Sequence, residues 1–136
     1  MVKMSAIYEG NLRCILTHGP SKNTIKTDAP IDNMGKGEAF SPTDLFAASL
    51  GSCMLTVMGI AAQKNNIDIK DTTIEIEKEM VTAPVRKIGK VSVIFYMAKE
   101  IAKDKRNLLE QAALNCPVHK SLHPNLQTPI QFIYPD

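Results

Sequence analysis

The sequence lacks the marks of a nucleic-acid-binding, disulfide-stabilised or secreted protein. Its 136 residues carry a formal net charge of only +2, with Lys and Arg spread along the chain, and 5% of them are aromatic. A nucleic-acid surface needs clustered positive charge, so we expect no nucleic-acid partner. Three cysteines without a C-x-x-C pair do not make a disulfide framework. The first residues contain no apolar segment that would direct secretion, so we expect a cytoplasmic protein.

The sequence does have enough apolar material for one folded domain. Hydrophobic residues make up 44% of the chain, which is sufficient for a buried core and excludes a wholly disordered chain. At this length we expect a single domain over residues 1–136. The longest apolar stretch, residues 45–62, contains no formal charge. We expect the fold to be organised around that stretch.

Residues 41–66 predict a long helix at the centre of the fold. Ser41 is a good N-cap, Pro42 suits the first helical position, and Asp44 lies where a capping box places its acid. Beyond this start the helix is apolar on every side, which is typical of a helix buried in a core. The stretch is long enough to span a membrane, but its serine, threonine and glycine residues dilute the hydrophobicity. We therefore expect a core helix and no membrane partner.

Alternation of polar and apolar residues predicts strands arranged in hairpins around this helix. The alternating segments are 5–17, 24–27, 73–79, 88–97 and 130–134. The turn-rich cluster 19–23 predicts a hairpin between the first two, and 28–38 predicts a loop leading into the helix.

Two further helices are expected after the fourth strand. One runs from Lys105 to about Asn115 with Asp104 as its N-cap. A short one starts at Pro117 and continues through Leu122. The order of elements predicts an α+β fold, an antiparallel sheet of hairpin strands with a long buried central helix.

Cys53, in the middle of the long helix, is reactive only if a cation reaches it. It lies eleven residues beyond Pro42, so the partial positive charge of the helix start cannot ionise it. Arg13 and Arg86 are the candidate cations, because Arg106 has the surroundings of a solvated helix residue. The alternative is that every cysteine is a small buried hydrophobe, which is the interpretation we favour for Cys14.

Cys116 is expected at the N-cap of the short helix, where unpaired N–H groups favour a thiolate. His119, three residues later, is a candidate base or hydrogen-bond partner. The two residues also have the spacing of metal ligands, but a zinc site needs three or four, and the other histidines are His18 and His123. The residue types alone leave core cysteines, two-cysteine redox chemistry and metal binding open.

Two segments resemble the signatures of the OsmC/Ohr family, the osmotically inducible and organic-hydroperoxide-resistance proteins. The first is residues 41–53, a small polar residue and Pro followed by an apolar small-residue run that ends at Cys53. The second is residues 115–122, which begins Asn-Cys-Pro and carries Cys116. The element order matches over nearly the whole chain, and we identify it as similar to a less characterised branch of this family.

The resemblance implies a thiol peroxidase for organic hydroperoxides, built as an intertwined homodimer with two active sites between its subunits. Cys53 would be oxidised to a sulfenic acid, and Cys116 would resolve it as a disulfide. An external dithiol such as a lipoyl group, or a small thiol, would then reduce that disulfide, and no bound cofactor is implied. Apolar residues of the long helix are the expected substrate pocket, namely Phe46, Leu50, Met54 and Met58.

The sequence departs from the family pattern at one position. Characterised members place a glutamate ten residues before the first cysteine, where it pairs with the activating arginine, and this chain has Thr43 there. Asp44 and Glu38 are the candidate substitutes. Arg13 is most similar to the family arginine, with Arg86 as the alternative. The missing acid also motivates a second hypothesis, a non-enzymatic protein that binds a small ligand and has inactive thiols.

Overall fold

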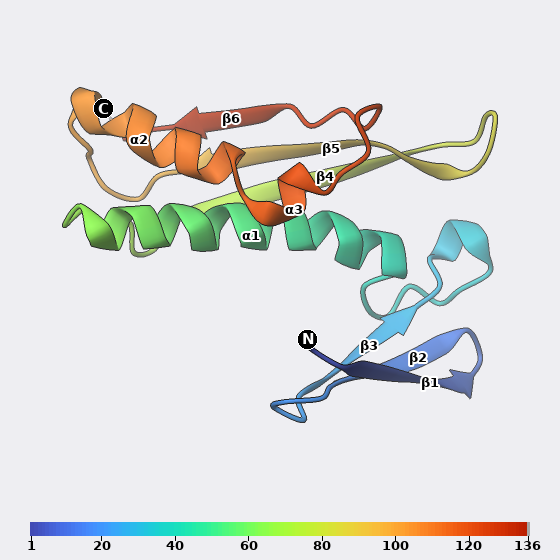
Figure 1. Ribbon diagram of the computed structural model, residues 1–136. Helices are drawn as coiled ribbons and strands as arrows, with labels where there is room; N and C mark the ends of the chain where they lie inside the picture. The colour runs from blue at the N-terminus through green and yellow to red at the C-terminus, as the bar shows by residue number, and fades with distance from the viewer. Residues whose placement is uncertain (136) are drawn as a thin grey trace. The chain divides into compact units, whose positions relative to one another are not determined.

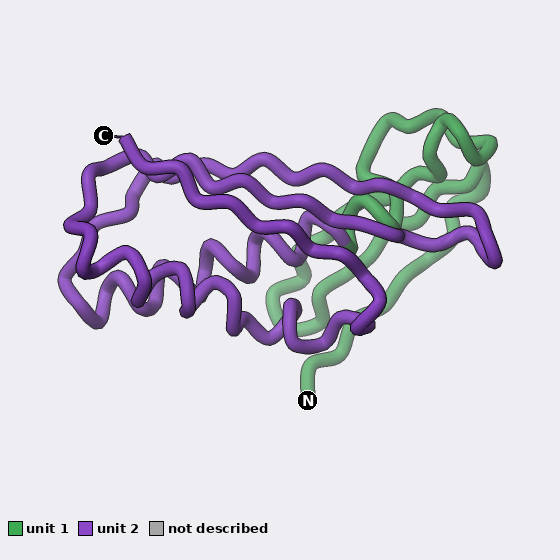
Figure 2. The backbone as a smooth tube through the Cα atoms, turned by 90° about the horizontal axis from the view of Figure 1, so that it is seen from above, with its two compact units in different colours: residues 1–46 green, residues 47–136 purple. Residues whose placement is uncertain are grey.

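The computed structural model describes residues 1–135, which form two compact units (Figure 1, Figure 2). Unit 1 is Met1–Phe46, and unit 2 begins at Ala47. Unit 1 contains strands, and unit 2 combines a sheet with helices, so the α+β prediction is confirmed. The single domain over 1–136 stays a prediction.

Unit 1 contains an antiparallel sheet of order β1-β2-β3. Its strands are β1 (Met4–Gly10), β2 (Arg13–His18) and β3 (Thr24–Asp28). The predicted β2–β3 hairpin is confirmed, but the single strand predicted over 5–17 is wrong. The chain reverses at Gly10, Asn11 and Leu12, whose φ angles are 89°, 56° and 63°. Leucine rarely adopts positive φ, so its type does not signal a turn.

The segment between β3 and the long helix is a loop, as predicted, and includes the short 3₁₀ helix η1 (Ile31–Asn33). Its two ends are joined by a main-chain hydrogen bond of 3.1 Å, which the N–H of Asp28 donates to the carbonyl of Phe40. The predicted capping box is present. The N–H of Asp44 donates to Ser41 Oγ at 3.0 Å, and the N–H of Ser41 donates to Asp44 Oδ2 at 3.0 Å.

Unit 2 is a three-stranded sheet of order β4-β5-β6 with helices packed on one face (Figure 1, Figure 2). Its elements are α1 (Pro42–Lys64, which begins in unit 1), β4 (Thr73–Val81), β5 (Lys87–Tyr96), α2 (Lys103–Leu114), α3 (Pro117–Lys120) and β6 (Ile130–Ile133). The predicted hairpin between β4 and β5 is confirmed as antiparallel. The β6 strand departs from an all-hairpin sheet, because it pairs with β5 in parallel. The connection through α2 and α3 is long enough to return the chain to the same end of the sheet.

Helix α2 starts earlier than predicted. It begins at Lys103, with Ala102 at the N-cap and no side-chain cap, so the expectation that Asp104 caps it is wrong. Ile101, just before the cap, is only 6% exposed. Its burial fixes the chain directly ahead of the helix, and Asp104 falls within the first turn.

The core of unit 2 lies between α1, α2 and β5. The fully buried side chains of α1 pack in one cluster with Val91, Val93 and Phe95 of β5 and Leu109 of α2. Gly51 of α1 lies against Ile74 and Ile76 of β4, and its lack of a side chain allows this close approach. A packed sheet face therefore holds the middle of α1, the turn that carries Cys53.

The predicted core helix is confirmed, but in the single chain it is buried on one face only. Six of its residues are buried, whereas Phe46 and Ile60 are 44% and 47% exposed. By length and composition α1 could cross a membrane, and a third of its most apolar window is buried. Its buried face packs on the sheet as a core helix does, which leaves a second, apolar face open.

Candidate active site

Two of the three cysteines are neighbours in unit 2. Cys53 lies in the middle of α1, half-buried against the core cluster, and Cys116 follows α2 and is fully buried. The Cys53 thiol is close enough to Cys116 to affect the pKa of that residue, and both are free thiols. Cys14 is a residue of β2 in unit 1. The structure thus brings together the two cysteines that the sequence motifs indicated.

Cys116 occupies the predicted N-cap of α3. Its backbone is extended, Pro117 is the first helical residue, and Sγ accepts a hydrogen bond of 3.3 Å from the N–H of His119. The helix ends at Lys120 instead of continuing to Leu122. The extended backbone of Cys116 and the hydrogen bond from the N–H of His119 together fix the orientation of the side chain, and therefore the position of the sulfur.

Burial decides the ionisation of Cys116. Loss of hydration is the largest influence and raises the pKa of the thiol, because a thiolate without water is unfavourable. The N–H of His119 acts in the opposite direction, and the neighbouring Cys53 raises the pKa further, since two thiolates repel. The helix start does favour a Cys116 thiolate, as expected, but burial outweighs it. Cys116 is held as a neutral S–H that can donate to the sulfur of Cys53.

The side chain of His119 is directed to another partner. Its Nε2 lies 3.2 Å from Thr128 Oγ1, in the segment that precedes β6. Only its main-chain N–H contacts the Cys116 sulfur. The predicted role of His119 as a base or partner at this thiol is thus corrected to a main-chain hydrogen bond.

Arg13 is held by carboxylates within unit 1. Its Nε and Nη2 donate to Asp28 Oδ1 and Oδ2 at 2.7 and 2.9 Å, and Nη2 also lies 3.3 Å from Glu38 Oε2. Glu38 was one of the two predicted substitutes for the missing acid, and it does contact Arg13. Asp44, the other, uses its carboxylate in the capping box.

Sequence reasoning missed Asp28, which makes the main contact with Arg13. The ion pair holds the pKa of this carboxyl below its ordinary value and raises that of Arg13, with the mutual hydrogen bonds as the largest cause. The signal that could have found it is strand register. Asp28 is the antiparallel partner of Arg13, and partners on one face of a hairpin have neighbouring side chains.

Arg86, the alternative cation, lies in a different unit from Arg13. It is exposed, in the loop that joins β4 to β5. Arg106, which the sequence suggested to be a solvated residue, instead lies with its guanidinium carbon 4.0 Å from the ring centre of Tyr134.

The expected substrate pocket is not formed by the predicted residues. Leu50, Met54 and Met58 are at most 1% exposed and belong to the core cluster, so they face the sheet and not an open cavity. Phe46 is 44% exposed and remains accessible. The reason is helical spacing, since Leu50, Met54 and Met58 follow one another at intervals of four on the face that packs on β5, whereas Phe46 lies one turn earlier, at the end of unit 1.

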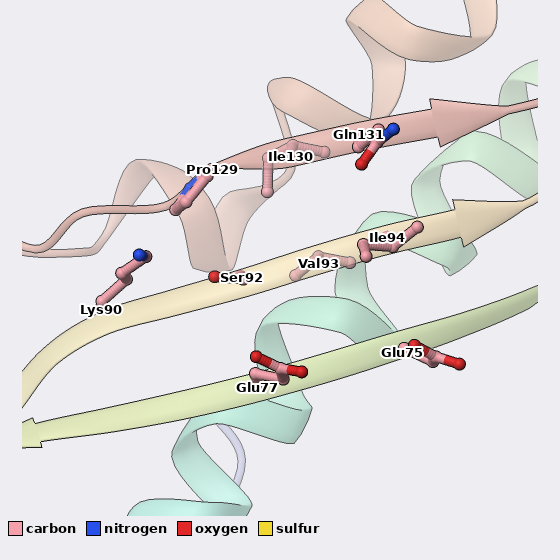
Figure 3. A pocket seen from close by; sticks show the side chains of 9 residues that line it. All are labelled: Glu75, Glu77, Lys90, Ser92, Val93, Ile94, Pro129, Ile130 and Gln131. Carbon is pink, nitrogen blue, oxygen red and sulfur yellow. The ribbon is translucent and has the colours of Figure 1, made fainter.

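A hollow of about 350 Å³ lies on the opposite face of the β4-β5-β6 sheet (Figure 3). Ser92, Ile94 and Gln131 line it, and Glu75, Glu77 and Lys90 give it a charged rim. Neither cysteine lines it, because the sheet separates it from α1. It is therefore not part of the thiol site.

Among residues 1–135 the structure shows no group of side chains that could hold a metal ion. Within residues 1–135, no three side chains of His, Cys, Asp and Glu lie close enough to hold one ion. Cys116 and His119 therefore stand as a pair without a third ligand, and zinc sites in proteins use three or four.

Comparison with known proteins gives one family. The model of the OsmC-like protein family matches residues 35–131. A protein of Psychrobacter arcticus, provisionally described as an osmotic stress induced and detoxification response protein, is 44% identical, with a TM-score of 0.93 over 98% of this chain and 96% of that one. No curated protein matches.

Two more distant structures share the fold. The organic hydroperoxide resistance protein OhrB of Bacillus subtilis is 23% identical, with a TM-score of 0.71 over 98% of both chains. An organic hydroperoxide resistance protein OsmC of Legionella pneumophila is 18% identical, with a TM-score of 0.77 over 97% of this chain and 96% of that one. With its thiol pair and the family match that contains both cysteines, the chain belongs to the OsmC-like family.

Proposed function

We propose that this protein is a thiol peroxidase that reduces organic hydroperoxides and serves in oxidative-stress defence. The observation that carries the proposal is the proximity of Cys53 and Cys116 in unit 2, where Cys53 packs against the core cluster that contains Cys116. A thiol that is oxidised by peroxide needs a second thiol within reach, and the fold supplies one from the start of α3. The organic hydroperoxide resistance proteins of Bacillus and Legionella, which share the fold, support organic hydroperoxides as the substrate class.

The reaction consists of three balanced steps. The Cys53 thiolate attacks the terminal peroxide oxygen, so that an S–O bond forms, the O–O bond breaks, and the alkoxide leaves as an alcohol after taking a proton. The Cys116 sulfur then attacks the sulfenic acid, which forms the disulfide and releases water. An external dithiol, such as a lipoyl group, or a small thiol restores both cysteines by thiol–disulfide exchange.

The different surroundings of the two sulfurs assign their roles. Cys53 is the half-buried thiol, and Cys116 is fully buried with a raised pKa. Because only a thiolate attacks a peroxide effectively, Cys116 does not compete for the first step. Its neutral S–H stabilises a Cys53 thiolate by donating a hydrogen bond. Cys53 is therefore the peroxidatic residue, and Cys116 is the resolving one.

Arg13 is our candidate for the cation that favours the Cys53 thiolate. Two carboxylates hold its guanidinium in unit 1, so it is ordered rather than free to follow solvent. Arg86 is the less suitable candidate, because it lies exposed in a loop.

We further propose a cytoplasmic homodimer. Apolar side chains are exposed in both units of the single chain, including Ile7 and Tyr8 of β1 and Phe46 and Ile60 of α1. Monomeric proteins rarely expose so much apolar surface, and a second copy of the chain is the partner that the family resemblance implies.

The test is a peroxidase assay with the purified protein, tert-butyl hydroperoxide and dihydrolipoamide, with hydrogen peroxide for comparison. We expect the organic peroxide to be consumed faster than hydrogen peroxide, Cys53→Ser to abolish turnover, and Cys14→Ser to retain it. If neither dihydrolipoamide nor small thiols sustain turnover and Cys53 stays reduced, the proposal is wrong, and the ligand-binding alternative takes its place.

A further inference from the structure

The two carboxylates that contact Arg13 differ in burial and in geometry. The Asp28 side chain is 3% exposed and the Glu38 side chain 59%. Asp28 binds Arg13 through two parallel hydrogen bonds of 2.7 and 2.9 Å, whereas Glu38 makes one contact of 3.3 Å. A paired fork fixes the plane of a guanidinium, but a single exposed contact exchanges readily with water. Asp28 therefore sets the orientation of Arg13.

The fold places Asp28 by strand register. Arg13 is the first residue of β2 and Asp28 the last of β3, and the two are direct partners in the antiparallel ladder. The backbone alone therefore brings the two side chains together, before any side-chain contact is considered.

The Asp28 carboxylate is itself held in place. Its Oδ2 accepts a hydrogen bond of 3.1 Å from the N–H of Glu38, and its own N–H donates to the carbonyl of Phe40 at 3.1 Å. These bonds tie the strand to the loop that follows it. These bonds hold the Asp28 carboxylate in one conformation beside Arg13, and a positioning residue must be fixed in this way.

Arg13 also borders a hollow within unit 1. The hollow has a volume of about 320 Å³ and is lined by Arg13 together with Glu9, Lys36 and Glu38. Within residues 1–46, its Nη1 makes no hydrogen bond to another residue. A buried acid on one edge and a free N–H edge opposite is the arrangement expected for an arginine that receives an anion.

We propose that Asp28 is the positioning residue for Arg13 in the peroxidase reaction, in place of the acid that is absent at Thr43. The inference rests on the proposed function, in which Arg13 supplies the activating cation. Thr43 and Asp44 lie in the first turn of α1, where Asp44 serves the helix cap. In this chain the acid that orients the arginine comes from the neighbouring strand of the hairpin.

The first test measures oxidation of the reduced protein by tert-butyl hydroperoxide in stopped flow. Displacing a catalytic group slightly costs about 100-fold in rate, so we expect Asp28→Asn to slow the oxidation of Cys53 by about that factor. Asp68→Asn is the matched control, because it removes the carboxylate of another ion pair, with Lys99. Exposed pairs contribute little, so it should change the rate by less than about threefold.

A double-mutant cycle separates positioning from a general loss of structure. If Asp28 acts only through Arg13, then Asp28→Asn in an Arg13→Ala background changes the rate by less than about twofold. Arg13→Lys keeps the positive charge but cannot form the two parallel hydrogen bonds, so its oxidation rate should resemble that of Asp28→Asn. It replaces Asp28→Asn in the test if Asp28→Asn does not fold. An equal loss in both backgrounds, or a normal rate in Arg13→Lys, would overturn the proposal.

A readout independent of turnover distinguishes this inference from the proposed function. In ¹⁵N NMR spectra, the Arg13 Nε–H should give a distinct, slowly exchanging signal that persists in Glu38→Gln and disappears in Asp28→Asn. Loss of the signal in Glu38→Gln alone would make Glu38 the positioning acid and overturn the inference. An inactive wild-type protein with the expected NMR pattern would instead contradict the peroxidase proposal.

Discussion

The Cys116 sulfur is subject to two opposing influences, and their balance gives it its role. The N–H groups at the start of α3 favour a thiolate, whereas complete burial favours the neutral thiol. Burial is the larger influence because α3 has one turn, and a single turn carries only a small dipole. A protonated resolving thiol beside a half-buried Cys53 keeps the two steps of the reaction in order.

The variant Cys116→Ser should therefore separate the two steps. We expect Cys53 to react with peroxide at close to the wild-type rate, because Cys116 does not attack peroxide itself and a serine hydroxyl can still donate a hydrogen bond to the Cys53 sulfur. The sulfenic acid should then persist, since no thiol resolves it. Trapping with dimedone, followed by mass spectrometry, measures this species. Failure of Cys53 to oxidise in the variant would show that Cys116 takes part in the first step.

The Arg13–Asp28 ion pair gives a second prediction, on the pH dependence of stability. The pKa of Asp28 is lower in the folded protein than its ordinary value of 3.8, so the pair stabilises the fold above that pH and loses this effect below it. Asp28→Asn should thus lower the free energy of unfolding at pH 7, and the difference from wild type should shrink below pH 3.8. Urea unfolding at several pH values measures it. A difference that grows as the pH falls would have the wrong sign.

Among the elements, α1 depends on one glycine for its contact with the sheet. A Cβ at Gly51 would lie 2.5 Å from Ile76 Cδ1 and 2.6 Å from Ile74 Cδ1, both on β4. At Gly59, in the same helix, a Cβ would meet no atom within 4 Å. The two glycines therefore share a helix but differ in whether a methyl group fits.

The pair Gly51→Ala and Gly59→Ala tests this packing. Alanine favours a helix over glycine by up to about 1 kcal/mol, so Gly59→Ala should raise the free energy of unfolding. Overpacking typically costs about 1–3 kcal/mol, so Gly51→Ala should be less stable than Gly59→Ala by about that amount. Thermal and urea unfolding compare them. Equal stability would mean that the isoleucines of β4 move aside freely.

The elements also show how far the sequence predicts this fold. The capping box at Ser41 and the Cys116 cap before Pro117 depend on local residue types, and both are present. The turn at Leu12 and the parallel pairing of β6 could not be read from the sequence. A leucine with positive φ has no compositional signal, and the direction of a strand depends on where distant helices return the chain.

The candidate site residues show the same difference between local and long-range signals. The motifs identified Cys53 and Cys116, but the dominant acid on Arg13 was missed, because it depends on hairpin register. The predicted pocket failed for a related reason. Composition shows that Met54 and Met58 are apolar, but not which face of α1 packs against the sheet.

At the scale of the molecule, the exposed apolar face of α1 supports the proposed dimer. Exposed apolar side chains occur on this helix and on β1, in a chain of 15.0 kDa. Burying such surfaces against a second copy removes them from water, which is the main favourable contribution to association. We therefore expect the folded protein to exist as a dimer.

Native mass spectrometry and size-exclusion chromatography should give about twice the mass of the chain. We expect Ile60→Glu, on the open face of α1, to shift the protein toward monomer, because a charge cannot be buried there without a partner. Leu108→Glu on α2 is the control, since Leu108 is similarly exposed (41%, against 47% for Ile60) but lies outside α1. A monomeric wild-type protein would contradict the proposed assembly.

The most direct test of the two-cysteine mechanism is disulfide mapping after one equivalent of tert-butyl hydroperoxide. The reduced protein is treated, alkylated and digested, and its cysteine peptides are identified by mass spectrometry. The mechanism predicts one intramolecular disulfide, between Cys53 and Cys116, with Cys14 alkylated as a free thiol. Full alkylation of Cys53 and Cys116 after peroxide treatment would contradict it.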